Sequence, residues 1–223
     1  MDMIKNSARM KSIDAASSSE HLSVAILLIT HSGIGYEMMN VVFTTFSEKA
    51  PTLNIHHLPI QPEQDPDDMI HQAKQLIKTI DTGAGVLILV SEKILKQFNL
   101  TPLARFSSFA VRGVAPEIMG IGPKEAIPAA LRAAGITQDQ LDWIELNEAF
   151  AAQALAVIGD LGLDPAKVNP MGGAIALGHP LGATGAIRAA TTIHAMRRKN
   201  LKYGMVTMCV GTGMGAAGIF ERM

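Results

Sequence analysis

Three segments in the second half of the chain place a reactive side chain where a strand would meet a glycine turn or a helix start. Asn147 directly follows the stretch LDWIEL, His179 stands within GGAIALGHPLGATG, and Cys209 precedes the turn VGTGMG. A side-chain amide can donate to a water or an oxyanion, and a histidine can act as a base or an oxyanion donor. A thiol at a strand end, close to backbone N–H groups, is placed like the cysteine of a reactive site.

Each of these three residues also has a plain structural interpretation. Asn147 could serve only as the cap of a helix from Glu148 to about Leu161. His179 could be a surface histidine in a tight turn, and Cys209 could be a buried strand cysteine, the commoner fate of a single cysteine. Spacing alone does not decide between these interpretations and a chemical one.

Four motifs occur in order over more than half of the chain. They are PEIMGIGP at 116–123, NEAFAAQ at 147–153, GGAIALGHPLGATG at 172–185 and CVGTGMGAAGIFE at 209–221. In this order they resemble the C-terminal half of thiolases, from roughly Leu100 to Glu221. The resemblance implies an α/β fold, a layered sheet with helices, and acyl transfer to and from coenzyme A. The reaction would be thiolysis of a 3-ketoacyl-CoA or the reverse Claisen condensation.

The resemblance also implies a role for individual residues. The residue matching His179 activates a nucleophilic cysteine and lines an oxyanion hole, and the residue matching Cys209 is the acid/base. The one matching Asn147 holds a water in an oxyanion hole, and the backbone N–H of Gly211 matches a donor that faces the acyl-enzyme oxygen. The residues that match the lining of the acyl and pantetheine tunnel are Met119, Ala149 and Phe150. Acyl-CoA and CoA would be substrates, and no cofactor would be permanently bound.

The cysteine content departs from the thiolase pattern. A thiolase uses two cysteines, and its nucleophile lies in the N-terminal half. The present 223 residues contain one cysteine, Cys209, which matches the acid/base position. One thiol cannot both hold the acyl group and move the proton. We therefore expect impaired turnover by the chain alone, with a thiolase N-terminal half or a second copy of the chain as the implied partner.

The elements that must position these residues alternate between strands and helices. In the second half we expect strands and helices at 104–114, 122–134, 141–146, 148–161, 185–198, 203–209 and 215–221, with Gly135 ending a helix. In the first half, the apolar runs 22–30 and 86–90 indicate strands buried on both faces, as in a parallel sheet. A weaker strand is expected at 53–58. Helices are expected at 36–48 and after Asp65, which can cap a helix that begins with Pro66.

The first half resembles the IIA phosphocarrier domain of the mannose-family sugar phosphotransferase system. The residues that carry this resemblance are SVAILLITH, ending at His31, the following Ser32 and Gly33, and the pattern IDTGAGVLILV. In that family a histidine that ends the first strand accepts a phosphoryl group, and His31 matches it. The stretch GAGVLILVSEKILKQFNL also resembles the strand and helix with which a thiolase leaves its N-terminal domain. The chain thus resembles two proteins joined where they share a pattern.

The predicted organisation follows from these resemblances. It comprises a disordered arm at 1–21, a partial IIA-like parallel-sheet segment at 22–90, a junction at 91–100 and a thiolase C-terminal domain at 101–223. The function remains open between CoA-dependent acyl transfer, a phosphocarrier or regulatory role through His31, and a non-catalytic chimera.

Composition excludes several other classes of protein. The formal net charge is −1 and aromatic residues make up 4%, so we expect no nucleic-acid partner. The longest apolar runs are far shorter than a membrane span, which predicts no membrane partner. A single cysteine excludes an intramolecular disulfide and a zinc site with several thiolates, and no metal site is expected. A lone thiol without export features predicts a cytoplasmic location.

Overall fold

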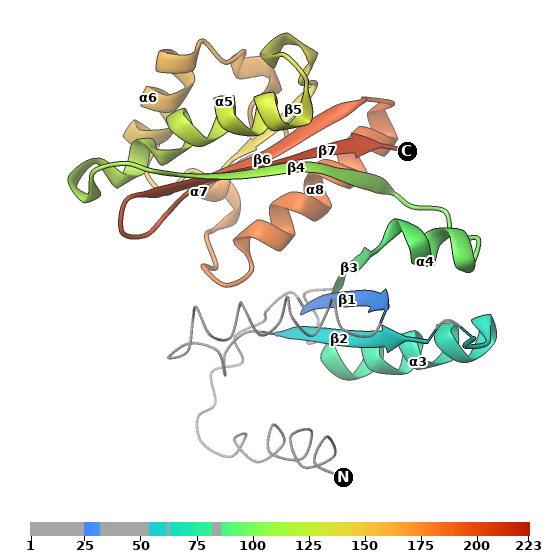
Figure 1. Cartoon of the computed structure of the whole chain (residues 1–223). Helices are drawn as coiled ribbons and strands as arrows, with labels where there is room; N and C mark the ends of the chain where they lie inside the picture. The colour runs from blue at the N-terminus through green and yellow to red at the C-terminus, as the bar shows by residue number, and fades with distance from the viewer. Residues whose placement is uncertain (1–24, 32–53, 62, 82–85) are drawn as a thin grey trace, which may run out of the picture.

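A computed structural model describes residues 25–31, 54–61, 63–81 and 86–223. The expected arm at 1–21 and the expected helix at 36–48 lie outside the described residues. The described chain forms two sheets with helices above, between and below them (Figure 1). Among the described residues, no helix has the length and apolar character needed to cross a bilayer.

The first sheet is parallel. Its strands are β1 (Ala25–His31), β2 (Ile55–Ile60) and β3 (Val86–Val90), in the order β2-β1-β3. Helix α3 (Pro66–Ile80) packs on one face through Met69, Ala73 and Ile80, and helix α4 (Glu92–Gln97) adds Ile94 to the same core. Parallel strands need crossover connections, which fits the alternation that the sequence predicts.

The start of α3 confirms its sequence prediction. Oδ1 of Asp65 accepts hydrogen bonds from the backbone N–H groups of Asp67, at 2.8 Å, and Asp68, at 3.3 Å. Pro66 occupies the first helical turn, where a missing N–H costs nothing. The local pattern is therefore sufficient to place this helix.

Strand β3 lies where the sequence predicts it, but the expectation that it is buried on both faces is wrong. Ile88 and Leu89 are 41% and 37% exposed. The reason is the position of β3 at an edge of the sheet, where only one neighbour, β1, pairs with it. An apolar run predicts a strand but carries no information about whether that strand is central or at an edge.

The second sheet carries the motifs described above. It consists of β4 (Ala104–Gly113), β5 (Trp143–Leu146), β6 (Tyr203–Val210) and β7 (Met214–Arg222), in the order β4-β7-β6-β5. Strands β5 and β6 are parallel, whereas the pairs β4–β7 and β6–β7 are antiparallel. Helices α5 (Gly122–Ala134) and α6 (Ala151–Leu161) cover one face, and α8 (Thr184–Lys199) covers the other (Figure 1).

Short helices complete this region: η2 (Pro116–Ile121), η3 (Gln138–Gln140), η4 (Pro165–Lys167) and α7 (Ala174–Leu177). As the sequence predicts, α5 ends at Gly135, which adopts a left-handed conformation with φ of 69°. Close packing also explains a glycine at the start of α5. A β-carbon on Gly215 of β7 would overlap the backbone of Gly122, so the helix can approach the sheet only because both residues lack a side chain.

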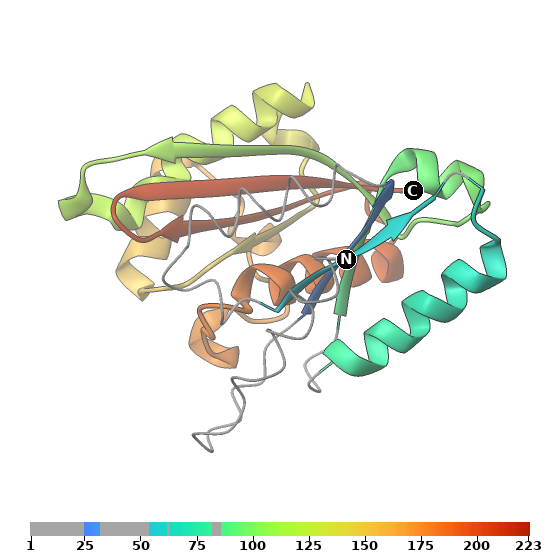
Figure 2. The ribbon, with the colours of Figure 1, turned by 60° about the horizontal axis from the view of Figure 1, so that its bottom comes forward.

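Helix α8 lies between the two sheets. Its apolar residues Ala189, Ile193 and Met196 form a cluster with the second sheet, and Leu87 of β3 packs against that cluster. The layers are therefore α5 with α6, the second sheet, α8, the first sheet, and α3 (Figures 1 and 2). In this order α8 is covered on both sides. The carboxyl ends of β5 and β6 lie beside its N-terminal end, and a site can form there.

Candidate active site

Asn147 and Cys209 leave the second sheet at the same edge. Strands β5 and β6 run parallel with Leu146 paired to Thr207, and the backbone N–H of Asn147 donates to the Thr207 oxygen at 2.9 Å. Cys209 lies two residues further along β6. In open α/β sheets, ligands bind at the carboxyl ends of parallel strands. The topology therefore places the amide and the thiol where a site is expected.

Asn147 does not cap a helix, so the structural interpretation of this residue is wrong. Helix α6 begins at Ala151, its N-cap is Phe150, and no side chain caps it. The Asn147 side chain is instead buried, with Nδ2 at 3.3 Å from Nε2 of His179. Its Oδ1 has no hydrogen-bond partner among the described residues. A buried polar atom without a protein partner is costly, and this oxygen can accept a hydrogen bond from a bound water or ligand.

His179 lies in the loop between α7 and α8, and a second side chain holds its ring. Nδ1 is 2.7 Å from Oγ1 of Thr184, the first residue of α8. The Thr184 hydroxyl in turn donates to the backbone oxygen of Pro180 at 2.9 Å. His179 is an exposed loop residue, as the structural interpretation expects, but both of its ring nitrogens contact other side chains, those of Asn147 and Thr184.

Cys209 is a half-buried free thiol near the end of β6. Burial raises the pKa of the Cys209 thiol, because the charged thiolate loses solvation. At neutral pH the sulfur is therefore protonated and can donate a proton. That state suits an acid more than a nucleophile.

Two glycines in the turn after Cys209 differ in whether the fold itself requires a glycine. Gly213 has φ of 90°, and a β-carbon there would overlap the backbone oxygen of Val114. Gly211 needs no left-handed backbone, and a β-carbon on it would have no atom within 4 Å. The fold of the described chain explains Gly213 but not Gly211. This difference is what we expect if the Gly211 backbone N–H is approached by a bound group.

The expected tunnel residues come from two elements in contact. Met119 lies in η2, and Phe150 immediately precedes α6. A β-carbon on Gly120 of η2 would lie 2.8 Å from Cγ of Gln153 in α6, so the two elements pack tightly. Met119 and Phe150 are both exposed, and Ala149 is half-buried. Phe150 lies three residues after Asn147 in the sequence, and Met119 lies in an element that packs against α6.

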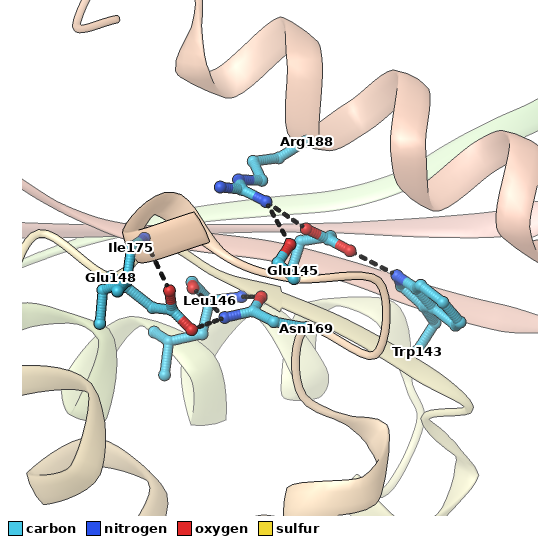
Figure 3. A network of polar contacts seen from close by, with 8 residues as sticks. Trp143, Glu145, Leu146, Glu148, Asn169, Ile175 and Arg188 are labelled. Atoms are coloured by element: carbon cyan, nitrogen blue, oxygen red, sulfur yellow. Dashed lines mark hydrogen bonds and ion pairs between the residues drawn. The ribbon is translucent and has the colours of Figure 1, made fainter. Parts of the chain in front are cut away.

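The sequence analysis missed a buried ion pair beneath the site. Oε2 of Glu145, in β5, accepts a hydrogen bond from Nη1 of Arg188, in α8, at 3.0 Å, and neither side chain is more than 2% exposed (Figure 3). Nε1 of Trp143 donates to Oε1 of Glu145 at 2.7 Å, and Nη1 of Arg188 also donates to the Gly172 oxygen at 3.2 Å. Burial raises the pKa of Glu145, while the hydrogen bonds that Glu145 accepts from Trp143 and Arg188 oppose the rise.

A second set of polar contacts holds the loop that leads to His179. The Glu148 carboxylate accepts from Nδ2 of Asn169 at 2.9 Å and from the backbone N–H of Ile175 at 3.0 Å (Figure 3). It also lies directly against Gly173, where a β-carbon would overlap it. The Asn169 side chain bonds both backbone groups of Leu146. A glutamate inside the apolar run WIEL was the one sequence signal that could have revealed a buried polar network.

Two further expectations concern the rest of the chain. His31 ends β1, but its side chain lies outside the described residues, so its phosphoryl role stays a prediction. Within the described part of the chain, no group of three or more His, Cys, Asp or Glu side chains could hold a metal ion.

Comparison with known proteins adds a family match to this geometry. The model of the family described as "Thiolase, C-terminal domain" matches residues 100–222. The 3-ketoacyl-CoA thiolase of Bacillus subtilis (strain 168) is 56% identical over 144 residues, which are 65% of this chain and 37% of that protein. Peroxisomal 3-ketoacyl-CoA thiolase 2 of Arabidopsis thaliana is 52% identical over 145 residues, 64% of this chain and 31% of that protein.

Solved structures agree with the sequence matches. The crystal structure of human mitochondrial 3-ketoacyl-CoA thiolase in complex with CoA matches with a TM-score of 0.59 and 48% identity, over 60% of this chain and 34% of that one. The chain spans about a third of the length of the curated relatives it matches. A match of 144 residues is longer than the stretch from Leu100 to the end of the chain, so it also includes residues before Leu100.

Proposed function

Because the model of the thiolase C-terminal domain matches more than half of its residues, the chain belongs to the thiolase family, and we propose that its second half serves in CoA-dependent acyl transfer. The observation that carries this proposal is the contact of the Asn147 amide with His179 at the sheet edge where Cys209 stands. The relatives named above are 3-ketoacyl-CoA thiolases, and one similar crystal structure contains CoA. The proposed substrates are acyl-CoA and CoA, without a permanently bound cofactor.

The proposed chemistry at this edge is proton transfer next to a thioester. The Cys209 sulfur removes a proton from the α-carbon of the acyl group in its thiolate form, which the raised pKa makes the minor form at neutral pH, and the electron pair moves onto the thioester oxygen. A water held by Asn147, together with the His179 ring, stabilises the resulting enolate. The backbone N–H of Gly211 faces the oxygen of the acyl-enzyme. Met119, Ala149 and Phe150 line the path of the acyl and pantetheine groups.

The covalent half of the reaction needs a second thiolate that accepts the acyl group. Cys209 is the single cysteine of these 223 residues, and proton transfer occupies it. We therefore propose that full turnover requires a thiol from a partner, either a polypeptide like a thiolase N-terminal half or another copy of the chain. The chain alone would perform the proton-transfer step and would be impaired in acyl transfer.

Exchange of α-hydrogens tests the proton-transfer step without the second thiol. The chain is incubated with acetyl-CoA in D2O, and loss of the methyl proton signal is followed by NMR. We expect exchange above the buffer rate, reduced on the order of 100-fold in Cys209→Ser, because a positioned base contributes about that much. We expect a reduction of about the same size in Asn147→Ala, because it removes a group that stabilises the enolate oxygen. His194→Gln, on the exposed side of α8, is the matched control and should leave exchange unchanged. Exchange that survives Cys209→Ser would remove the role assigned to Cys209.

A thiolysis assay tests the need for a partner. Acetoacetyl-CoA and CoA are mixed with the chain, and thioester loss is measured with and without an added thiolase N-terminal half. We expect turnover only with the added half. Rapid turnover by the chain alone would contradict the proposal that a second thiol must be supplied.

A second candidate function concerns the first sheet. We propose as the alternative that 22–90 forms a partial IIA-like part, joined through 91–100 to the thiolase part at 101–223, and that His31 accepts a phosphoryl group. What favours it is the position of β1 at the centre of a parallel sheet, with His31 at its carboxyl end. Incubation with the histidine-containing phosphocarrier protein should then label the chain but not His31→Ala. Absence of label, together with absence of exchange, would leave a non-catalytic chimera.

A further inference from the structure

The turn between β6 and β7 contains a residue whose backbone conformation is unusual for its type. In the described part of the chain, the non-glycine residues with a positive φ are Asn99, Asn169, Asn200 and Thr212. Asparagine tolerates the left-handed region, whereas a β-branched residue is a steric outlier there. Thr212, with φ of 67°, is therefore the strained residue of this set, and it lies three residues after Cys209.

Packing does not explain a threonine at this position. Thr212 is exposed, so its methyl group fills no space in a core. A glycine would adopt the same backbone conformation without strain, and the chain does use a glycine for the next residue, Gly213, with φ of 90°. A strained residue that packing does not require indicates that its side chain has another task.

The Thr212 hydroxyl contacts the backbone of the preceding residue. Its Oγ1 donates a hydrogen bond to the backbone oxygen of Gly211 at 2.6 Å. This local bond from side chain to backbone limits rotation about the bond between Cα and the carbonyl carbon of Gly211. Because χ1 of a β-branched side chain is restricted, the hydroxyl stays beside this oxygen.

Gly211 lies in a part of the turn that packing leaves open. Gly213 is fixed, because its backbone oxygen accepts a hydrogen bond from the N–H of Val114 at 2.7 Å. Gly211, in contrast, is exposed, and a β-carbon on it would have no atom within 4 Å. The hydrogen bond from Thr212 is therefore a contact that limits how the peptide groups of Gly211 are oriented.

We propose that Thr212 is a positioning residue that holds the backbone of Gly211, and so the direction of its N–H, at the edge of the sheet where Cys209 lies. The inference deepens the proposed function, and its consequence rests on that function, in which this N–H donates to an acyl oxygen. A donor that is oriented in advance needs no reorganisation when charge develops on the oxygen. The rigidity of Gly211 exists without substrate, so it can be measured whether or not the chain transfers acyl groups.

NMR relaxation of the full chain, labelled with 15N, measures this rigidity directly. We expect the order parameter of the Gly211 amide to be about 0.85, as in a rigid backbone, and to fall below about 0.6 in Thr212→Val. This variant removes the hydroxyl and keeps the β-branched shape, whereas Thr212→Ser keeps the hydroxyl and should stay close to the wild-type value. A mobile Gly211 in the wild type, or a rigid Gly211 in Thr212→Val, would overturn the proposal without reference to any activity.

Stability and α-hydrogen exchange, measured together, separate positioning from general structure. Thr212→Gly relieves the strain, so we expect the midpoint of urea denaturation not to fall. Exchange should fall about tenfold, a part of the roughly 100-fold that one oxyanion donor contributes. Asn200→Gly is the matched control, because Asn200 has φ of 55° at the C-terminal end of α8, and it should change neither exchange nor the order parameter of Gly211.

Two results would contradict the positioning role of Thr212. One is unchanged exchange in Thr212→Gly, which would mean that the chain merely tolerates the threonine. The other is a loss of exchange that only follows a lower urea midpoint. If the wild type shows no exchange at all, the proposed function fails, and the order parameters still decide whether Thr212 holds Gly211.

Discussion

The two sheets of this chain differ in what fixes their geometry. In the first sheet, apolar side chains of β1, β2 and α3 form the core, and the polar contacts lie at the margins, such as the Asp65 cap and the exposed Lys96–Glu92 pair. In the second sheet, ionic and amide groups are buried between elements. Glu145 meets Arg188, Asn169 bonds Leu146, and Asn147 meets His179.

This difference indicates which interactions fix the relative positions of helices and strands. Apolar contacts are not directional, so a sheet and a helix held by them tolerate small shifts. A buried polar group must meet its partner within hydrogen-bond distance or lose free energy, so it fixes the distance between elements. The second region therefore fixes the relative positions of β5, the loop before α7, and α8. Asn147 directly follows β5, and His179 lies in the loop between α7 and α8.

Removing one member of the buried ion pair should give the largest effect. Arg188→Ala leaves the Glu145 carboxylate buried without its cation, and we expect a loss of about 3–5 kcal/mol in the free energy of unfolding. The single tryptophan, Trp143, donates to Glu145, so urea denaturation followed by its fluorescence measures this region.

A matched variant of the first region sharpens the test. Lys96→Ala removes one partner of an ion pair whose side chains are 76% and 74% exposed, and we expect no measurable change in stability. If Arg188→Ala were as harmless as Lys96→Ala, the buried network would not be what distinguishes the two regions. Replacing both Glu145 and Arg188 by apolar residues of similar volume should restore much of the loss.

Substitution of Gly215, which lies against the backbone of Gly122, should give the next largest effect. Gly215→Ala places a β-carbon against the backbone of Gly122, and backbone cannot move aside as a flexible side chain can. We expect a loss of about 1–3 kcal/mol, measured by the same denaturation. Gly211→Ala meets no atom within 4 Å and should leave stability unchanged, while lowering the α-hydrogen exchange proposed above. Equal destabilisation by both substitutions would contradict the conclusion that packing requires a glycine at position 215 but not at position 211.

The cap of α3 should give a smaller effect, confined to the first region. Asp65→Ala removes the acceptor for two backbone N–H groups, and we expect a loss of about 1 kcal/mol. Circular dichroism during urea denaturation measures it, and Asp65→Asn, which keeps an acceptor, is the control. A change in the α-hydrogen exchange rate with Asp65→Ala would show that the two regions are coupled more closely than their separate cores suggest.

Much of the fold could be predicted because its signals are local. Asp65 and Pro66 mark the start of α3, and Gly135 marks the end of α5, within a few residues of the elements that they terminate. The four ordered motifs likewise predicted the thiolase C-terminal domain. By contrast, the exposure of β3 depends on which strands flank it, and no run of apolar residues contains that information.

The site could be predicted only in part, for a similar reason. Asn147 has a residue type that suits both a helix cap and a site, and the contact that decides between them is with His179, 32 residues away. Glu145 and Arg188 are 43 residues apart. Arg188 looks like an ordinary solvent-facing residue of a predicted helix until the sheet is in place.

The reactivity of Cys209 provides the most sensitive test of burial at the edge of the second sheet. Because burial raises the pKa of its thiol, less of the sulfur is thiolate at neutral pH, and the thiolate is the nucleophile. We expect iodoacetamide to modify Cys209 several-fold more slowly than glutathione near pH 7. The rate rises with pH as the thiol loses its proton, and we expect the midpoint of this rise to lie at a higher pH than for glutathione.

The pH profile distinguishes a raised thiol pKa from poor access of the reagent to the sulfur. Steric protection alone would scale the rate equally at every pH and would not move the midpoint of the rise, whereas a raised pKa moves the midpoint. The chain unfolded in urea should return to the profile of an ordinary cysteine, because the sulfur is then solvated. A midpoint at or below that of glutathione would mean that groups near the end of β6 stabilise the thiolate. That result would contradict the raised pKa of Cys209, but not its proton-transfer role, because the thiolate is also the form that removes a proton.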